Sequence, residues 1–565
     1  MNKYKEIILI VLLIAIIGIP RMVGLGNFTS VDEQYWLQSS ANFYYALGQH
    51  QFENTVYGYH PAVTTMWIIT MGMLAYFPEY RALGQGYLKP GKYNLFMPAH
   101  DKDPLQLLIV SRGIQVIVIV VLLLIIFFLL RRMFDDRSAF FTTSLISLSP
   151  FFLGHSRLLN HEAMLSLFLL ISLLGMLVYL YIERKWLLLV LSACAAALGQ
   201  LTKSSGLPVI PIIMLVIMVY ALGSQHGKLG QKLLEAFRMI VIWLFALVFF
   251  YILFWPGMWV APAKMLYVVY GNALGYMFQG MTLEAMPTLD PSSFRLGSLS
   301  NGLQIYLSDL VWRTTLVSWL GFIVGIWIAV ANLRKKIDKN YQWIILYSLI
   351  LAISFVLLFS IERGRQSPHY ILTTYVCLDL IAGLGISRAL DFLAHRFPKI
   401  IQGWTTWAIL AVILALQLIS SVGSYPYYIT YYNPFVAALL PQSENPILKG
   451  TGYGVGVDQA AAYLAQKAGA SEMTVLSAYA EGSFSYYFPG KTESMNDLDL
   501  RDPVIVEILR SSQYAVVDYY NQKSIGLLTG LEGVKPEKII WINGIEFLHI
   551  YRASDLLASL DSAPH

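Results

Sequence analysis

An acidic pair, Asp32-Glu33, opens a predicted helix over 31–47. Ser30, with Glu33 three residues later, forms a capping-box pattern in which Glu33 ties back to the Ser30 backbone amide. Asp32 is then the less constrained carboxylate, and the helix dipole favours its ionised form in the first turn. Such a carboxylate can accept a proton from a hydroxyl group or orient a cation. Asp32 is therefore a candidate catalytic base, and Glu33 is either a second catalytic carboxylate or a capping residue.

A lysine stands between two apolar runs in Thr202-Lys203-Ser204-Ser205-Gly206, and the runs are too close together for a long loop. A tight turn that combines a cation, hydroxyl groups and the free amides of the next helix suits a phosphate group. The alternative is a lysine whose side chain only extends to the membrane headgroups. Lys203 is a candidate phosphate ligand.

Several more ionisable residues fall at the ends of apolar runs, where such side chains are costly and therefore indicate function. Arg157 and Glu162 could share one helical face, either in a site or as a structural ion pair. Glu162 is a candidate catalytic residue. The spacing of Glu33, Glu162 and the histidines allows a divalent ion but does not require one, so no cofactor is required. The candidate binding residues are His60, Arg112, Arg157, Lys203, Arg365 and His369.

These residues need a membrane scaffold. The chain has 565 residues, of which 57% are hydrophobic and 13% are charged, whereas soluble domains have roughly 45–50% and 25%. Apolar runs of about twenty residues can cross the bilayer as helices. We predict about eleven spans: 7–19, 107–130, 138–153, 163–182, 186–201, 207–222, 237–255, 306–331, 341–360, 370–387 and 401–420.

Alternate connections between these spans carry the excess of Lys and Arg that is typical of cytoplasmic loops. This pattern predicts a multi-pass protein of the plasma (inner) membrane with a cytoplasmic N-terminus and an extracytoplasmic C-terminal domain. The long segments 20–106 and 256–305 then lie outside. Aromatic residues in the first of them indicate interface helices over about 31–47 and 61–77. The net charge of +5 is scattered, so a nucleic acid is not an expected partner.

The composition changes near residue 450, which divides the chain into a transmembrane domain (1–422), a linker (423–449) and a small α/β domain (450–565). We predict a helix from Asp458 to Lys467, strands at 473–479 and 514–519, and a strand pair around Asn543-Gly544. The run Gly452-Tyr453-Gly454-Val455-Gly456 lacks the strand before it that a nucleotide-binding loop needs. The two cysteines are expected to be buried apolar residues.

Taken together, these segments resemble the protein O-mannosyltransferase and aminoarabinose transferase group of the glycosyltransferase C superfamily, in its prokaryotic form with an outer C-terminal domain. The resemblance covers most of the chain. It rests on Asp32-Glu33, His60-Pro61, Arg112, Arg157 to Glu162, Leu201-Thr202-Lys203 with Gly206, Tyr425 to Pro434, Gly454 to Gln459 and Asn543 to Glu546. The chain departs from the group at His369-Tyr370, where Arg-Tyr is frequent, and at Glu162, where Asp is common.

The resemblance implies an inverting transferase that moves a single sugar from a polyprenyl-phosphate carrier to a hydroxyl acceptor, which could be a protein, a lipid or a glycan, on the outer face of the membrane. It implies Asp32 as the base, Lys203, Arg112 and Arg365 as phosphate ligands, and Glu162 near the sugar or the acceptor. The Trp-Trp-Asp signature of oligosaccharyltransferases is absent. An alternative function is a transporter or flippase of lipid-linked sugars, although the two similar halves and broken helices frequent in transporters are not evident.

Overall fold

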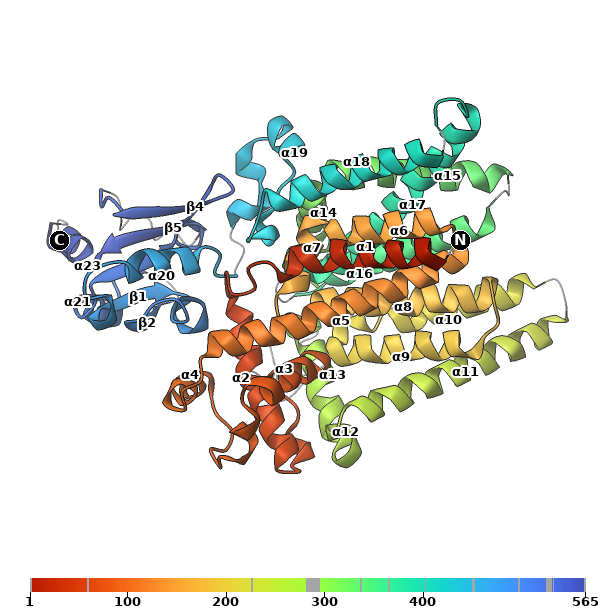
Figure 1. Cartoon of the computed structure of the whole chain (residues 1–565). Helices are drawn as coiled ribbons and strands as arrows, with labels where there is room; N and C mark the ends of the chain where they lie inside the picture. Colours follow the sequence, from red (N-terminus) through yellow and green to blue (C-terminus); the bar gives the residue numbers. More distant parts are fainter. Residues whose placement is uncertain are drawn as a thin grey trace.

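The structure is a computed structural model that describes residues 3–57, 60–224, 227–280, 295–335, 338–363, 366–401, 403–449, 453–495, 498–524, 531 and 533–562. Long apolar helices lie side by side, and a small sheet domain stands at one end of them, with the two chain termini at opposite ends of the molecule (Figure 1). The chain is thus a polytopic helical membrane protein with a C-terminal domain of mixed β-sheet.

Seven helices in the described part of the chain are long and apolar enough to cross a membrane, or eight if one bent pair counts as a span. The number of about eleven that the sequence predicted is not confirmed. The seven are α5 (Pro104–Met133), α8 (Glu162–Tyr181), α10 (Val209–Gly223, with the turn η3, Ser204–Gly206), α11 (Leu229–Phe254), α16 (Lys339–Ser360), α17 (Leu372–Arg396, with the turn η5, Pro368–Ile371) and α18 (Gly403–Val422).

Three other predicted spans fall short for local reasons. Helix α1 (Lys3–Met22) carries Lys5, Glu6 and Arg21 near its ends. The predicted span 138–153 is two helices, α6 (Asp136–Leu148) and α7 (Pro150–Arg157), because Pro150 cannot continue the first helix and starts the second. Helix α9 (Trp186–Thr202) has 17 residues and is apolar but short.

The predicted span 306–331 is not a single straight helix. It consists of α14 (Leu299–Arg313) and α15 (Leu316–Lys335), which meet at 112°. Asn433 stabilises the break, because its backbone amide donates to Trp312 O (2.7 Å) and its side-chain amide to Thr314 O (2.9 Å). These carbonyl groups therefore find partners outside the helix, as helix ends require.

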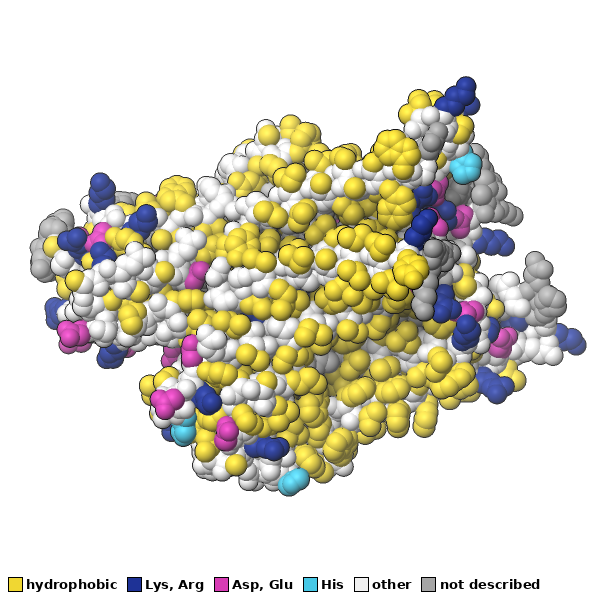
Figure 2. All heavy atoms as spheres, in the orientation of Figure 1, with side chains coloured by type: hydrophobic (Ala, Val, Ile, Leu, Met, Phe, Trp, Pro, Cys, Tyr) yellow, Lys and Arg dark blue, Asp and Glu magenta, His cyan; other side chains and the backbone are white. Residues whose placement is uncertain are grey.

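The surface of the bundle is apolar. Large side chains of α11 and α18, among them Phe237, Phe245, Trp404 and Ile419, are exposed. Figure 2 shows hydrophobic side chains over the middle of the visible face, whereas Lys and Arg gather toward its two ends. Because soluble monomers rarely expose such continuous apolar areas, this surface fits the bilayer. Helices α8 and α17 are almost fully buried and form the centre of the bundle.

The segment between α1 and α5 contains short helices at the end of the bundle that faces the sheet domain: α2 (Val31–Gly48), α3 (Val63–Tyr76) and α4 (Pro90–Ala99). The first two confirm the helices predicted over 31–47 and 61–77. Asn42 fixes the loop before α4 against α2, since its side-chain amide donates to Leu88 O (2.9 Å) and its oxygen accepts from Leu88 N (3.0 Å). Helices α12 (Gly257–Val260) and α13 (Pro262–Gln279) follow α11.

After α18 the chain forms η6 (Tyr428–Thr430) and α19 (Pro434–Leu439), and then the C-terminal domain. Its five strands are β1 (Thr474–Ala478), β2 (Lys491–Met495), β3 (Tyr514–Asp518), β4 (Lys538–Ile542) and β5 (Ile545–Arg552), in the order β2-β1-β3-β5-β4. The first three are parallel, and β5 runs antiparallel to β3 and β4. Helices α20 (Val457–Ala465), α21 (Pro503–Arg510), α22 (Tyr519–Ser524) and α23 (Ala553–Ser562) flank the sheet, with the turn η10 (Ala480–Phe484) after β1.

The predicted helix after residue 457, the strands near 473–479 and 514–519 and the strand pair at Asn543-Gly544 are confirmed. Asn543 (φ 52°) and Gly544 (φ 75°) have the left-handed backbone of a tight hairpin turn. Strand β2 was not predicted, because its sequence, Lys-Thr-Glu-Ser-Met, is polar. The domain boundaries at 422 and 450 stay predictions.

Candidate functional site

A cavity of about 870 Å³ lies among the membrane helices and is lined mostly by apolar side chains. The polar and charged side chains in its wall include His60, Lys203, Ser204, Ser205 and Glu362. The remaining wall comes from α10, the turn before it, α13 and α16, and it includes Leu207, Pro211, Leu274, Met277, Leu357 and Phe359. This combination fits a ligand with one charged end and a long apolar part.

Lys203 reaches the cavity because the chain changes direction there. Helix α9 ends at Thr202, Lys203 has an extended backbone (φ −156°, ψ 136°), and the turn η3 leads to Pro208 and α10. Gly206 allows this turn to approach α8, since a Cβ atom there would lie 3.0 Å from Leu165 Cδ1. The short turn between two apolar runs is thus as predicted.

The Lys203 ammonium is buried and paired. Its Nζ atom donates to Glu162 Oε1 (2.5 Å) and lies 4.4 Å from the centroid of the Tyr370 ring. The His369 imidazole is also near, with Nε2 3.8 Å from Glu162 Oε1. The structure therefore brings together Lys203, Glu162 and His369, three residues singled out in the sequence.

Three further histidines surround this group. His161 lies beside His60 (ring centroids 5.8 Å apart), and its Nδ1 atom is 2.9 Å from Thr65 Oγ1. His155 lies beside His369 (5.9 Å), and its Nδ1 atom is 2.7 Å from Asn160 Nδ2. Burial, followed by the positive charge of Lys203, lowers the pKa of His60 well below its usual value, so this imidazole is neutral at pH 7.

Some buried polar atoms of this group have no hydrogen-bond partner among the described residues. They are Ser205 Oγ, His155 Nε2 and His161 Nε2. Buried polar groups are normally hydrogen-bonded, so each atom of this kind needs an explanation. A polar ligand in the site would provide partners for them.

Glu33 and Arg112 form a separate, fully buried pair. Arg112 Nε and Nη2 donate to the two Glu33 carboxylate oxygens (2.7 and 2.5 Å). Glu33 also accepts from the backbone amides of Ser30 (2.9 Å) and Leu159 (2.8 Å), and Arg112 donates to Phe28 O (2.8 Å). The capping interpretation of Glu33 is confirmed. In this conformation neither side chain faces the cavity, and together they fix the start of α2.

The position of Asp32 is set by this pair, because Asp32 precedes Glu33 at the start of α2. It lies in the first turn of α2, its side chain is exposed, and it is not part of the cavity wall. Its negative charge and that of Glu162 act on Tyr453 in the C-terminal domain. Burial, followed by these two charges, raises the pKa of the Tyr453 phenol well above its usual value.

Arg157 does not pair with Glu162. Helix α7 ends at Arg157 and α8 starts at Glu162, so the two side chains do not share a helical face. Arg157 Nη2 donates to Val23 O (2.8 Å) and Gly24 O (2.6 Å), and the guanidinium stacks on Tyr425 and Tyr428. These contacts hold the connection between α1 and α2. Arg365, another predicted ligand, lies outside the described residues.

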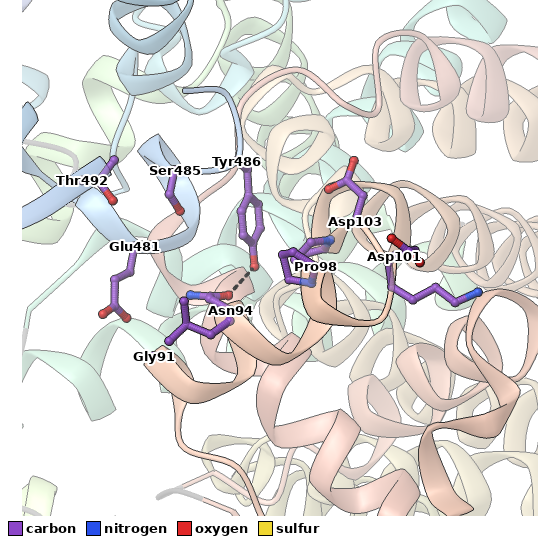
Figure 3. Close-up of a pocket in the computed structure, with 12 residues that line it drawn as sticks. Gly91, Asn94, Pro98, Asp101, Asp103, Glu481, Ser485, Tyr486 and Thr492 are labelled. Carbon is purple, nitrogen blue, oxygen red and sulfur yellow. Dashed lines mark hydrogen bonds between the residues drawn. The ribbon is translucent and has the colours of Figure 1, made fainter. Parts of the chain in front are cut away.

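A second cavity, of about 750 Å³, separates α4 from the C-terminal domain. Figure 3 shows Gly91, Asn94 and Pro98 on one side and Glu481, Ser485 and Thr492 on the other. Tyr486 crosses the gap and lies 3.2 Å from Asn94, Oη to Oδ1. The segment between α1 and α5 and the C-terminal domain are thus in contact around this hollow.

Within the described ranges, no group of three or more His, Cys, Asp or Glu side chains is arranged to hold a metal ion. Neither His155 nor Glu362 nor Tyr453 was predicted as a site residue. The rule that ionisable side chains at membrane depth indicate function could have identified the first two. Tyr453 offered no such signal, because its position depends on how the C-terminal domain docks.

Comparison with known proteins finds one matching family and several similar solved structures. Residues 108–257 match the family described as dolichyl-phosphate-mannose-protein mannosyltransferase. ArnT from Cupriavidus metallidurans, bound to undecaprenyl phosphate, shares 13% identity over 100% of both chains with a TM-score of 0.46, and its apo form shares 15% (98% of this chain and 99% of that one, TM-score 0.46).

The oligosaccharyltransferase of Archaeoglobus fulgidus, tethered to an acceptor peptide, shares 13% identity over 95% of this chain and 72% of that one, with a TM-score of 0.49. No curated protein sequence matches the chain significantly. The family match agrees with the resemblance inferred from the sequence.

Proposed function

We propose that the chain is an inverting membrane glycosyltransferase, because residues 108–257 match the dolichyl-phosphate-mannose-protein mannosyltransferase family. It moves a single sugar from a polyprenyl-phosphate carrier to a hydroxyl acceptor, which could be a protein, a lipid or a glycan. The reaction takes place on the outer face of the membrane, and the C-terminal domain lies on the same side.

The observation that carries this proposal is the mostly apolar 870 Å³ cavity with Lys203 in its wall. The apolar wall suits an isoprenoid chain, and Lys203 with the hydroxyl groups of Ser204 and Ser205 suits its phosphate. Ser205 Oγ has no hydrogen-bond partner among the described residues and could donate to a phosphate oxygen. Lysine is a frequent phosphate ligand because it offers a compact charge with three donors.

The sugar is proposed to occupy the side of the phosphate where Glu162 and the histidines lie. His155 Nε2 and His161 Nε2 are buried without partners in the described structure, and sugar hydroxyls would provide them. Glu162, next to Lys203, accepts from a sugar hydroxyl. His60 and His369 complete this part of the site.

In the reaction, the acceptor oxygen attacks the anomeric carbon on the face opposite the phosphate. The new carbon–oxygen bond forms as the bond between the anomeric carbon and the phosphate oxygen breaks, and its electron pair leaves with polyprenyl phosphate. The acceptor proton goes to Asp32. Lys203 stabilises the negative charge that develops on the leaving group, which is an electrostatic contribution of the oxyanion-hole type.

Glu33, Arg112 and Arg157 have a supporting role in this scheme. The Glu33–Arg112 pair and the contacts of Arg157 fix the start of α2 and thereby the position of Asp32. Arg112 is not proposed to bind the phosphate, because it is fully buried against Glu33, and Lys203 is the proposed phosphate ligand. Arg365 remains a proposed phosphate ligand.

The test uses purified full-length protein, labelled polyprenyl-phosphate sugar and an acceptor extract. Asp32→Asn should lower transfer by about 100-fold or more, as removal of a general base does, with binding of polyprenyl phosphate unchanged. Lys203→Ala should lose this binding. Glu79→Gln, which changes an exposed carboxylate in the same outer segment, is the matched control and should transfer normally.

Three results would contradict the proposal. One is an Asp32→Asn protein as active as wild type. Another is that no common sugar is released from its carrier. The third is movement of intact lipid-linked sugar across vesicles without any chemistry, which would indicate a flippase.

A further inference from the structure

Tyr453 reaches from the C-terminal domain into the candidate site. Its side chain is 6% exposed. Its ring lies edge-on to His155 (centroids 5.6 Å apart) and to His369 (5.4 Å). His369 in turn lies 3.8 Å from Glu162. A residue of the sheet domain therefore covers the histidines that surround Glu162 and Lys203.

The loop that carries Tyr453 lies against the start of α2. Gly454 has a φ of 70°, which a side chain would disfavour, and a Cβ atom there would lie 3.4 Å from Val31 Cγ1. Val31 precedes Asp32. Gly454 belongs to the glycine-rich run that was compared above with a nucleotide-binding loop. In the structure, Gly454 instead allows the backbone to pass close to α2, the helix that carries the proposed base.

Other contacts fix this loop relative to α2. Tyr487 Oη donates to Gly26 O (2.8 Å), just before α2, and lies 2.8 Å from Thr29 Oγ1. Tyr427 Oη donates to the Asp458 carboxylate at the start of α20 (2.8 Å). The position of Tyr453 is therefore set by the docking of the whole domain rather than by a loose loop.

Asp32 is exposed, whereas Glu162 and the histidines His155 and His161 are buried. A base open to solvent can activate water as well as an acceptor hydroxyl. Transfer without hydrolysis then requires that water be kept from the anomeric carbon. Tyr453 packs on His155 and His369, and the next residue, Gly454, lies against Val31 beside Asp32, so Tyr453 is placed close to both the proposed base and the buried histidines.

We infer that Tyr453 is a positioning residue that closes the site on the acceptor side, so that the hydroxyl of a docked acceptor, and not water, takes the sugar. The inference rests on the proposed function. The aromatic ring of Tyr453 provides the barrier by packing on His155 and His369. Without the ring, water attacks the anomeric carbon, its proton goes to Asp32, and the products are free sugar and polyprenyl phosphate.

The test measures free sugar released from labelled polyprenyl-phosphate sugar by the full-length protein without acceptor. Tyr453→Ala should raise hydrolysis about tenfold, since a barrier to water is removed. Tyr453→Phe keeps the ring and should behave as wild type. Tyr463→Ala is the control in the same domain, because the Tyr463 hydroxyl contacts Glu537 (2.8 Å) and not the site. Wild-type hydrolysis by a Tyr453→Ala protein that still transfers sugar would overturn the inference.

A second readout does not depend on activity. Diethylpyrocarbonate modifies accessible imidazoles, and His155 has an exposure of 0%. Mass spectrometry should find more modified His155 in Tyr453→Ala than in wild type or Tyr463→Ala. Equal labelling would overturn the inference even if no sugar transfer is found, whereas absence of transfer by wild type alone contradicts the proposed function.

Discussion

Glu362 lies on the wall of the 870 Å³ cavity, as do Lys203 and His60. Burial raises the pKa of its carboxyl group to about 7, although the charge of Lys203 acts in the opposite direction. At neutral pH this carboxyl group is therefore partly protonated. Above pH 7 it places a negative charge on the wall that we propose binds a phosphate.

Polyprenyl phosphate should accordingly bind less tightly as the pH rises from 6 to 8. We expect a loss of about fivefold in wild type relative to Glu362→Gln, from about 1 kcal/mol of charge repulsion. The variant is the control for the titration of the phosphate itself, whose second pKa is about 6. Binding to labelled polyprenyl phosphate at several pH values measures the effect, and identical pH profiles would contradict it.

The same group affects stability in a defined direction. Its folded pKa of about 7 lies above the ordinary value of 4.5. Its contribution to stability is therefore fully present below pH 4.5 and is lost as the pH rises through about 7. Glu362→Gln should remove this part of the pH dependence of unfolding.

The role of a residue could be predicted from the sequence where that role depends on residues nearby in the chain. Ser30 and Glu33 are three residues apart, so the capping role could be foreseen, and Lys203 was conspicuous between two apolar runs. The partner of Glu33 was not foreseen, because Arg112 is 79 residues away. The resemblance implied Arg112 as a phosphate ligand, whereas the structure pairs it with Glu33.

At the scale of helices, α15 and α17 pack closely through glycines. A Cβ atom on Gly385 would lie 2.5 Å from Gly325 Cα and 2.6 Å from Gly321 O. Small residues that allow such contact are a general feature of membrane helix packing. These glycines hold α17, which follows the turn with His369, against the rest of the bundle.

Gly385→Ala should lower the free energy of unfolding by about 1–3 kcal/mol, the cost of overpacking. Gly113→Ala on α5 is the matched control, because a Cβ atom there has nothing within 4 Å, and it should be neutral or slightly stabilising. Thermal unfolding in detergent measures both. A Gly385→Ala protein as stable as Gly113→Ala would refute this account of the contact.

Helices were predicted best where one apolar run forms one element. The predictions for α5, α8 and α16 hold within a few residues. The break between α14 and α15 could not be predicted, because Asn433, whose side chain binds the carbonyl at the break, lies 119 residues further along the chain. Arg313, Thr314 and Thr315 are polar at that point, but the apolar residues on both sides make the run read as continuous.

At the scale of the whole molecule, the C-terminal domain is attached to the bundle by side-chain contacts as well as by the chain. Tyr487 binds Gly26 and Thr29, and Tyr486 binds Asn94. The linker segment 423–449 is also held, since Tyr432 Oη donates to Asn543 O (3.1 Å). The domain should therefore stay in place if the linker is cut.

A protease site inserted within the exposed turn Gln442–Glu444 tests this. After cleavage, the two pieces should co-elute in size-exclusion chromatography. With Tyr486→Phe and Tyr487→Phe together they should separate at a lower urea concentration, since each lost hydrogen bond costs about 1 kcal/mol. Separate elution of the cut wild type would contradict the docking.

The docking itself could not be predicted. The strands and the hairpin at Asn543-Gly544 were evident from local sequence, but nothing in the order of residues indicates that Tyr453 meets His155, almost 300 positions earlier. Gly454 and Gly456, which follow Tyr453, stood out in the sequence only because a glycine-rich run can form a nucleotide-binding loop. Contacts between domains depend on surface shape, which a single sequence does not reveal.

The apolar cavity among α10, α13 and α16 has a consequence for kinetics. If the donor and the spent carrier keep their tails in the bilayer, the enzyme meets them by diffusion in two dimensions. Its rate then follows the mole fraction of carrier among the lipids rather than the amount per volume of solution. Inert lipid then acts as a diluent, so membrane growth alone would lower the rate of the proposed transfer.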